Sequence, residues 1–193
     1  MTDLPTGASA LPARAEWIAT AGWFILLLSA GLALLPLVGR AQGATIIGIL
    51  LVLAGLAELF AGSLRHDTRR LAMLAGVITT LAGILFATES STHFLSTLTI
   101  IAGWLFGRSI VLILAARLAT GSVRTWTGLA ALTDLVLGLI LAVGLSIASL
   151  IVSLFGATPP MIASFAWILA ASFIATAMLL LEVSNCARAS ESV

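Results

Sequence analysis

Long apolar stretches separated by short polar ones are the main pattern of this chain. A helix that crosses the hydrocarbon layer of a membrane needs about 20 mostly apolar residues, because each residue rises about 1.5 Å. Six stretches meet this requirement: residues 17–36, 43–64, 71–87, 95–118, 126–149 and 160–181. None of them shows the period-two alternation that marks a strand of a membrane barrel. The pattern predicts an all-α polytopic membrane protein with six transmembrane helices.

The breaks between these stretches carry proline, glycine and charged residues. Pro36 is expected to end the first span, and turns are expected at residues 65–70, 89–93, 121–124 and 156–160. The apolar segment 147–155 either extends the fifth helix or lies in the membrane interface. The expected organisation is a short disordered tail at residues 1–16, a transmembrane domain at residues 17–182 and a cytoplasmic tail at residues 183–193.

Composition agrees with a chain whose main solvent is lipid. Of the 193 residues, 61% are hydrophobic and only 9% are charged, against about 25% charged in soluble domains. An ordinary soluble enzyme is therefore excluded, and a net charge of +1 excludes the basic surface of a nucleic-acid binder. The single cysteine, Cys186, allows no internal disulfide. The expected partners are the lipid bilayer and a membrane protein or a second copy of the chain.

Arginine placement predicts the orientation, because basic residues accumulate in cytoplasmic loops. With both termini cytoplasmic, that side holds seven arginines: Arg14, Arg65, Arg69, Arg70, Arg117, Arg124 and Arg188. The opposite side then holds only Arg40. The asymmetry predicts that both termini are cytoplasmic and that the six spans form three consecutive hairpins, at residues 17–65, 69–117 and 124–182.

The first two hairpins match one another in sequence. A shift of 52 positions places Gly31 on Gly83, Gly55 on Gly107 and Arg65 on Arg117 without a gap. Repeats that all start in the cytoplasm would be related by an axis along the membrane normal. The third hairpin follows the same spacing only in its first helix, where Gly138 lies as far from Arg124 as Gly83 lies from Arg69.

This pattern resembles the HdeD family of bacterial inner-membrane proteins. The resemblance is carried by the first-helix segments 30–36, 81–86 and 137–141 and by the second-helix segments 55–61 and 107–109. It implies three membrane hairpins and a role in resistance to acid or membrane stress. The family has no agreed enzymatic activity, so the resemblance implies no catalytic residues and no cofactor.

Small residues recur along the predicted helices. Glycines that let helix backbones approach closely drive association in lipid. The candidates for such packing are Gly31, Gly48, Gly55, Gly62, Gly76, Gly83, Gly107 and Gly138.

Three charged residues fall inside predicted spans, namely Glu58, Arg108 and Asp134. At about 1.5 Å per residue all three lie at a similar depth in the cytoplasmic half. A charge in hydrocarbon is costly unless it is paired, so we expect Arg108 to pair with Glu58, Asp134 or both. The cluster is either a structural lock on helix packing or a proton or ion relay.

Two residues of the outer loop form a candidate pH sensor. Glu89 and His93 lie four residues apart, and histidine titrates near pH 6.5. The alternative is an ordinary solvated loop.

No metal-binding or nucleophile motif occurs in the sequence, so no enzyme is expected. The leading hypothesis is a non-enzymatic inner-membrane stress protein. The alternatives are a small proton, ion or solute transporter and an accessory subunit of a larger membrane complex.

Overall fold

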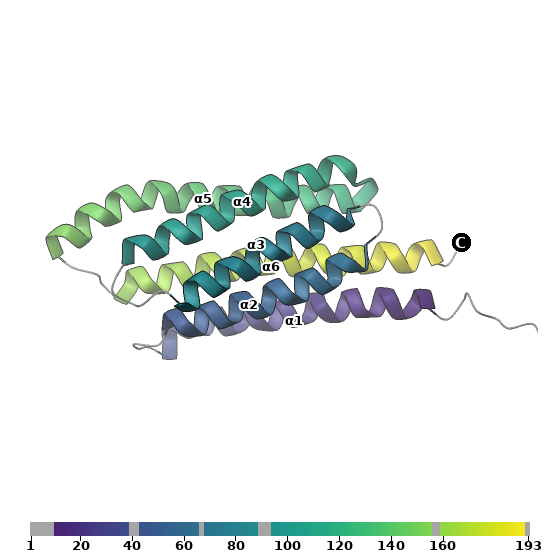
Figure 1. Ribbon diagram of the computed structural model, residues 1–193, viewed down its shortest axis with the longest axis horizontal. Coiled ribbons are helices and arrows are strands. Elements are labelled where there is room, and N and C mark those ends of the chain that lie inside the picture. The colour runs from purple at the N-terminus through teal and green to yellow at the C-terminus, as the bar shows by residue number, and fades with distance from the viewer. Residues whose placement is uncertain (1–9, 39–42, 66–67, 89–93, 156–158, 192–193) are drawn as a thin grey trace, which may run out of the picture.

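Six helices form one elongated bundle (Figure 1). A computed structural model describes residues 10–38, 43–65, 68–88, 94–155 and 159–191. The helices are α1 (Ala10–Val38), α2 (Gly43–Ser63), α3 (Arg69–Thr88), α4 (Phe94–Leu118), α5 (Gly121–Phe155) and α6 (Pro159–Glu191). All six are long and apolar enough to cross a membrane. The all-α prediction with six spans is confirmed.

Several helices extend beyond the ends predicted from the sequence. The prediction of a disordered tail at residues 1–16 is wrong for residues 10–16, because α1 begins at Ala10. Proline is tolerated in a first turn, where its missing N–H has no intrahelical acceptor. Pro36 does not end α1, which continues to Val38. The tail predicted at residues 183–193 is helical as far as Glu191.

Segment 147–155 was expected either to extend the fifth helix or to lie in the membrane interface. This segment continues α5, which has 35 residues and ends at Phe155. The turn predicted at residues 121–124 is instead the first turn of α5, and the connection from α4 is only two residues long. Gly121 has a φ of 59° there, a conformation that costs glycine least.

The helices form a closed ring in chain order, since each helix packs against the next and α1 packs against α6. Packing is closest for α2 with α3, α4 with α5, and α1 with α6. It is looser within the three predicted hairpins, α1–α2, α3–α4 and α5–α6. Close and loose contacts therefore alternate around the ring.

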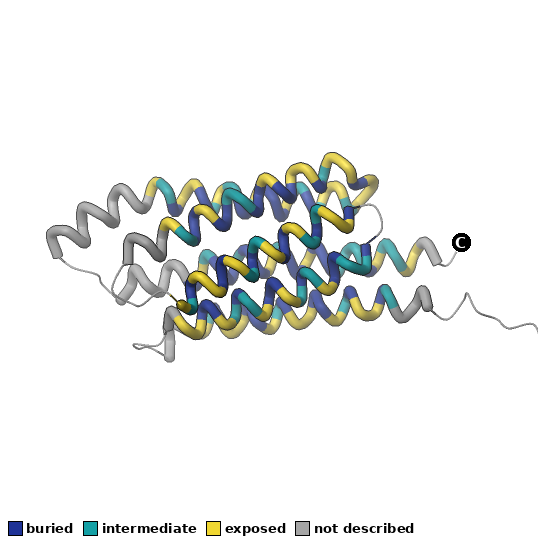
Figure 2. The backbone as a smooth tube through the Cα atoms, viewed as in Figure 1, coloured by how far each residue is buried: buried dark blue, intermediate teal, exposed yellow. Residues whose placement is uncertain are grey.

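Each helix has a buried face toward the interior of the bundle and an exposed face on its outer surface (Figure 2). The buried core joins residues of all six helices, such as Ile25, Leu51, Leu105 and Leu169. Many leucines, isoleucines and valines on the outer surface are exposed. Such a surface suits a lipid solvent and would be unfavourable in water.

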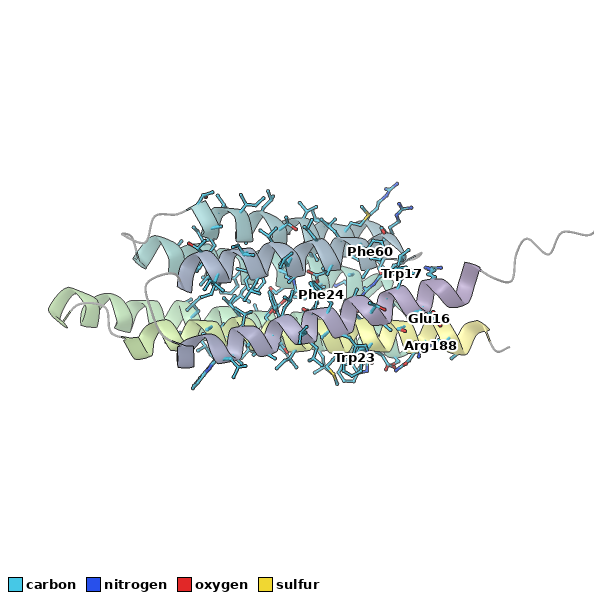
Figure 3. The ribbon with its side chains drawn as sticks, turned by 90° about the horizontal axis from the view of Figure 1, so that it is seen from below. Glu16, Trp17, Trp23, Phe24, Phe60 and Arg188 are labelled. Atoms are coloured by element: carbon cyan, nitrogen blue, oxygen red, sulfur yellow. The ribbon has the colours of Figure 1, made fainter. Side chains whose placement is uncertain are left out.

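The arginine-bearing segments lie at one end of the bundle. Figure 1 shows the start of α1, the end of α6 and the turns α2–α3 and α4–α5 at this end. In Figure 3, Glu16, Trp17 and Arg188 are labelled toward it. Trp17 of α1 meets Phe60 of α2 here, with ring centroids 6.0 Å apart and planes at 82°. We call this end the arginine-rich end.

Candidate functional site

Three charged side chains from three helices meet in the interior of the bundle. Glu58 comes from α2, Arg108 from α4 and Asp134 from α5. Their exposed fractions are only 7%, 1% and 0%. Glu58 and Asp134 each lie on an inward-pointing helix face of small residues, beside Gly55 and Gly62 for Glu58 and beside Ala130 and Ala131 for Asp134. Small neighbours leave room for the long guanidinium between the helices.

The Arg108 guanidinium lies between the two carboxylates. Its Nη2 donates to Glu58 Oε1 at 2.6 Å, and its Nη1 donates to Asp134 Oδ2. Ion pairs with this hydrogen-bonded geometry are among the strongest contacts available to a buried charge. The structure therefore brings together the three charged residues that the sequence placed at a common depth.

Two hydroxyl groups of α6 complete the coordination of Arg108. Nη2 also donates to Thr176 Oγ1 at 2.5 Å, and Nη1 to Ser172 Oγ at 3.3 Å. Ser172 in turn donates to Asp134 Oδ1 at 2.5 Å, and Thr176 donates to the Ser172 carbonyl at 2.9 Å. Each hydroxyl accepts a hydrogen bond from the guanidinium and donates one to another oxygen.

Helix α3 and an indole enclose the other side of the cluster. Thr79 Oγ1 lies 3.2 Å from Glu58 Oε2, to which it donates, and it accepts from Trp104 Nε1 at 3.2 Å. The Arg108 guanidinium carbon lies 5.9 Å from the Trp104 ring centroid, close enough for a cation–π interaction. The polar cluster thus consists of Glu58, Thr79, Trp104, Arg108, Asp134, Ser172 and Thr176, from five of the six helices.

A second buried arginine lies toward the arginine-rich end. Arg65 follows the end of α2 and is 8% exposed. Burial lowers the pKa of Arg65 to about 10, and the nearby Glu58 carboxylate opposes this shift. Arg65 therefore remains charged at neutral pH and is a second cation within electrostatic reach of the Glu58 carboxylate.

Nearly all charged N–H groups and carboxylate oxygens of the cluster hydrogen-bond within the cluster. Four of the five guanidinium N–H groups of Arg108 donate to oxygen, and all four carboxylate oxygens accept at least one hydrogen bond. Among the described residues only Arg65 Nε, Arg108 Nε and Thr127 Oγ1 are buried side-chain atoms without a partner. Such an arrangement holds helices in one relative position and presents no free nucleophile.

Two surface clefts lie apart from the cluster. One lies between α4 and α5 at the arginine-rich end, and the other lies between α5 and α6. Neither is lined by Glu58, Arg108 or Asp134. In the described part of the chain, no group of three or more histidine, cysteine, aspartate or glutamate residues could hold a metal ion.

The glycines of α2 and α3 lie at the closest helix contact. A Cβ on Gly55 would come within 2.4 Å of Thr80 Oγ1, and a Cβ on Gly76 within 2.6 Å of the Leu59 nitrogen. Gly48, Gly62 and Gly83 make contacts of the same kind with backbone atoms. These five glycines therefore lie where the backbones of α2 and α3 approach each other closely.

The other three candidate glycines lie outside this contact. A Cβ on Gly138 would lie 3.3 Å from the Phe106 ring, so Gly138 packs against α4. Gly31 and Gly107 make no such contact, since a Cβ there would meet no described atom within 4 Å. Gly31 and Gly83 match in the two hairpin sequences, but only Gly83 is packed against a neighbouring helix.

The structure does not describe the candidate pH sensor, and it places two of the tryptophans away from the cluster. Glu89 and His93 lie outside the described residues. Trp23 and Trp167 are 61% and 59% exposed on the outer surface, whereas Trp104 is buried in the cluster. The sequence alone did not predict the roles of Thr79, Ser172 and Thr176 or the burial of Arg65. The serine and threonine contacts were hard to predict, because the hydroxyl of either residue in a membrane helix can also hydrogen-bond to the backbone of its own helix.

Together, the six apolar helices and their lipid-compatible surface define a multi-pass membrane protein. Comparison with protein-family models, with curated proteins and with solved structures finds no match.

Proposed function

We propose that this chain is a non-enzymatic protein of the bacterial inner membrane that acts in resistance to acid and membrane stress. The single observation that carries the proposal is the enclosure of Arg108, which is 1% exposed and bound by two carboxylates and two hydroxyls. A site that must bind a substrate needs free polar groups. Here those groups bind one another, which favours a structural lock.

A locked bundle suits a protein that must survive acid. The Glu58 and Asp134 carboxylates are enclosed by protein, so protons reach them only when the bundle opens. Resistance of this kind is kinetic, because it depends on the rate of opening. The stress role itself rests on the resemblance to the HdeD family.

The proposal includes both termini on the cytoplasmic side and three hairpin repeats. The gathering of arginine-bearing segments at one end of the bundle supports the orientation. The alternation of close and loose contacts around the ring supports the repeats. Three hairpins around a common axis would generate two classes of contact in this alternating order.

A proton or ion transporter is the second candidate. One observation favours it: hydrogen bonds link the Trp104 indole, the Thr79 hydroxyl, the Glu58 carboxylate, the Arg108 guanidinium and the Asp134 carboxylate in one continuous chain. Such chains occur in proton pathways of membrane proteins.

Proteoliposomes with an internal pH dye separate the two candidates. With an imposed proton gradient, we expect vesicles containing the protein to lose the gradient no faster than protein-free vesicles. A faster loss that disappears when Glu58, Arg108 and Asp134 are all replaced by leucine would favour the transporter.

The stress role is tested by expressing the chain in a bacterium that has no copy of this protein of its own. We expect the expressed chain to raise survival after acid shock and to leave growth at neutral pH unchanged. The folded triple-leucine protein should protect equally well, since a lock can be replaced by apolar packing. Equal survival with and without the chain would contradict the proposal.

A further inference from the structure

The cleft between α4 and α5 combines charge with an apolar wall. It has a volume of about 350 Å³ and opens on the outer surface at the arginine-rich end. Its lining is formed by Ile113, Ala116 and Arg117 of α4 and by Arg124, Thr125 and Gly128 of α5. No carboxylate lines it.

Both arginines of the cleft are free to bind an anion. Arg117 and Arg124 are exposed, and neither forms an ion pair with any residue that the structure describes. Two arginines on one cleft repel one another unless an anion lies between them. A phosphate group satisfies both, because guanidinium forks match its oxygens.

The short α4–α5 turn holds these arginines in place. Only two residues separate Leu118 from Gly121, and Gly121 takes the left-handed conformation that reverses the chain there. Arg117 in the last turn of α4 and Arg124 in the first turn of α5 therefore lie on adjacent rigid helices. A Cβ on Gly128 would meet no described atom within 4 Å, so this wall of the cleft is open.

The surface beside the cleft is apolar along both helices. Leu114 and Leu118 of α4 and Leu129 and Leu132 of α5 are all exposed. This surface continues toward the middle of the predicted spans, where acyl chains lie. A ligand with a phosphate at one end and hydrocarbon at the other would satisfy both parts.

We propose that the cleft binds the headgroup of an anionic phospholipid from the surrounding leaflet. Arg117 and Arg124 donate to the phosphate oxygens and Thr125 supplies a further hydroxyl. The acyl chains lie against Ile113 and the exposed leucines. Basic pockets between membrane helices bind anionic headgroups in this way.

Lipid titration of the detergent-purified protein tests the proposal. The ligands are dimyristoylphosphatidylglycerol, dimyristoylphosphatidylcholine with the same chains, and inorganic phosphate. Retained lipid is counted by native mass spectrometry, and the melting temperature is followed in parallel. We expect the anionic lipid alone to bind and to raise the melting temperature.

Variants locate the site. Arg117→Gln combined with Arg124→Gln should weaken the apparent affinity for the anionic lipid about tenfold or more. The matched control, Arg69→Gln with Arg70→Gln, removes the same charge from the same end of the bundle and should retain the affinity. Gly128→Leu fills the cleft without changing charge and should also weaken binding.

Any of four outcomes would overturn the proposal. Equal losses in the cleft and control variants would indicate diffuse attraction to the basic end. Equal binding of phosphatidylcholine, or displacement by inorganic phosphate, would remove the anionic lipid as the specific ligand. If the doubly substituted protein fails to fold, unchanged binding by the folded Gly128→Leu protein would still refute the site.

Discussion

Arg108 is the residue on which the interior of the bundle depends. An ionised side chain in a membrane interior is costly, and its cost falls only when partners surround it. Here Glu58, Asp134, Ser172 and Thr176 surround it. Removing one member therefore leaves the others buried and unpaired, whereas removing all charges at once leaves an apolar core.

We expect Arg108→Leu to destabilise the protein by about 3–5 kcal/mol, since it leaves two buried carboxylates without a cation. The triple variant with Glu58→Leu and Asp134→Leu should recover most of this loss. Thermal unfolding of the detergent-purified protein, followed by tryptophan fluorescence, measures both effects.

Arg70→Leu serves as the control for the loss of an arginine, because Arg70 is exposed in the first turn of α3. Its melting temperature should stay near that of the parent. An Arg108→Leu protein as stable as this control would show that the ion pairs carry no net stabilisation.

At the scale of the helices, the contact between α2 and α3 is set by glycine. Gly48, Gly55 and Gly62 of α2 lie against α3, and Gly76 and Gly83 of α3 lie against α2, with backbone atoms of the other helix where a side chain would otherwise lie. Close backbone approach replaces the hydrophobic driving force that is missing in lipid. This contact also orients Glu58, which lies on the same face of α2.

We expect Gly55→Ala to destabilise the protein by about 1–3 kcal/mol, because the new methyl group would overlap Thr80. Gly103→Ala on α4 is the matched control, since its Cβ would meet no described atom within 4 Å. That change should be neutral or should stabilise by up to about 1 kcal/mol through helix propensity. Equal melting temperatures for the two variants would contradict the contact.

At the scale of the whole molecule, the arginines are asymmetric between the two ends of the bundle. Both described ends of the chain and both arginine-rich turns lie together (Figure 1). An even number of spans requires the two termini to share a side of the membrane. The accumulation of arginines at that end then predicts that this side is the cytoplasm.

Reporter fusions test this topology. A reporter fused after Val193 should be active on the cytoplasmic side, and one inserted at Ser91 should be active on the opposite side. Protease accessibility in right-side-out vesicles provides an independent measurement. A C-terminal reporter on the outer side would reverse the orientation and would place the lipid cleft in the outer leaflet.

The sequence by itself determined the number of spans and the depth of the charges within them. Both follow from local quantities, namely the transfer free energy of about 20 consecutive residues and the fixed rise of a helix. Helix ends were less well determined. The residues near Ala10 and Glu191 are polar enough to read as tails, yet they continue helices that pack as one closely contacting pair.

Only the tertiary structure decided which residues meet. Six helices of similar length and composition can be arranged in many orders, and contacts between helices distant in the chain depend on how their surfaces fit. The placement of α6 brings Ser172 and Thr176 within hydrogen-bonding distance of Arg108. Gly83 packs in the contact between α2 and α3, whereas Gly31 of α1 has no described atom within 4 Å of its Cβ position. Hydropathy fixes how deep a residue lies along the membrane normal, but the packing of side chains fixes its neighbours within the membrane plane.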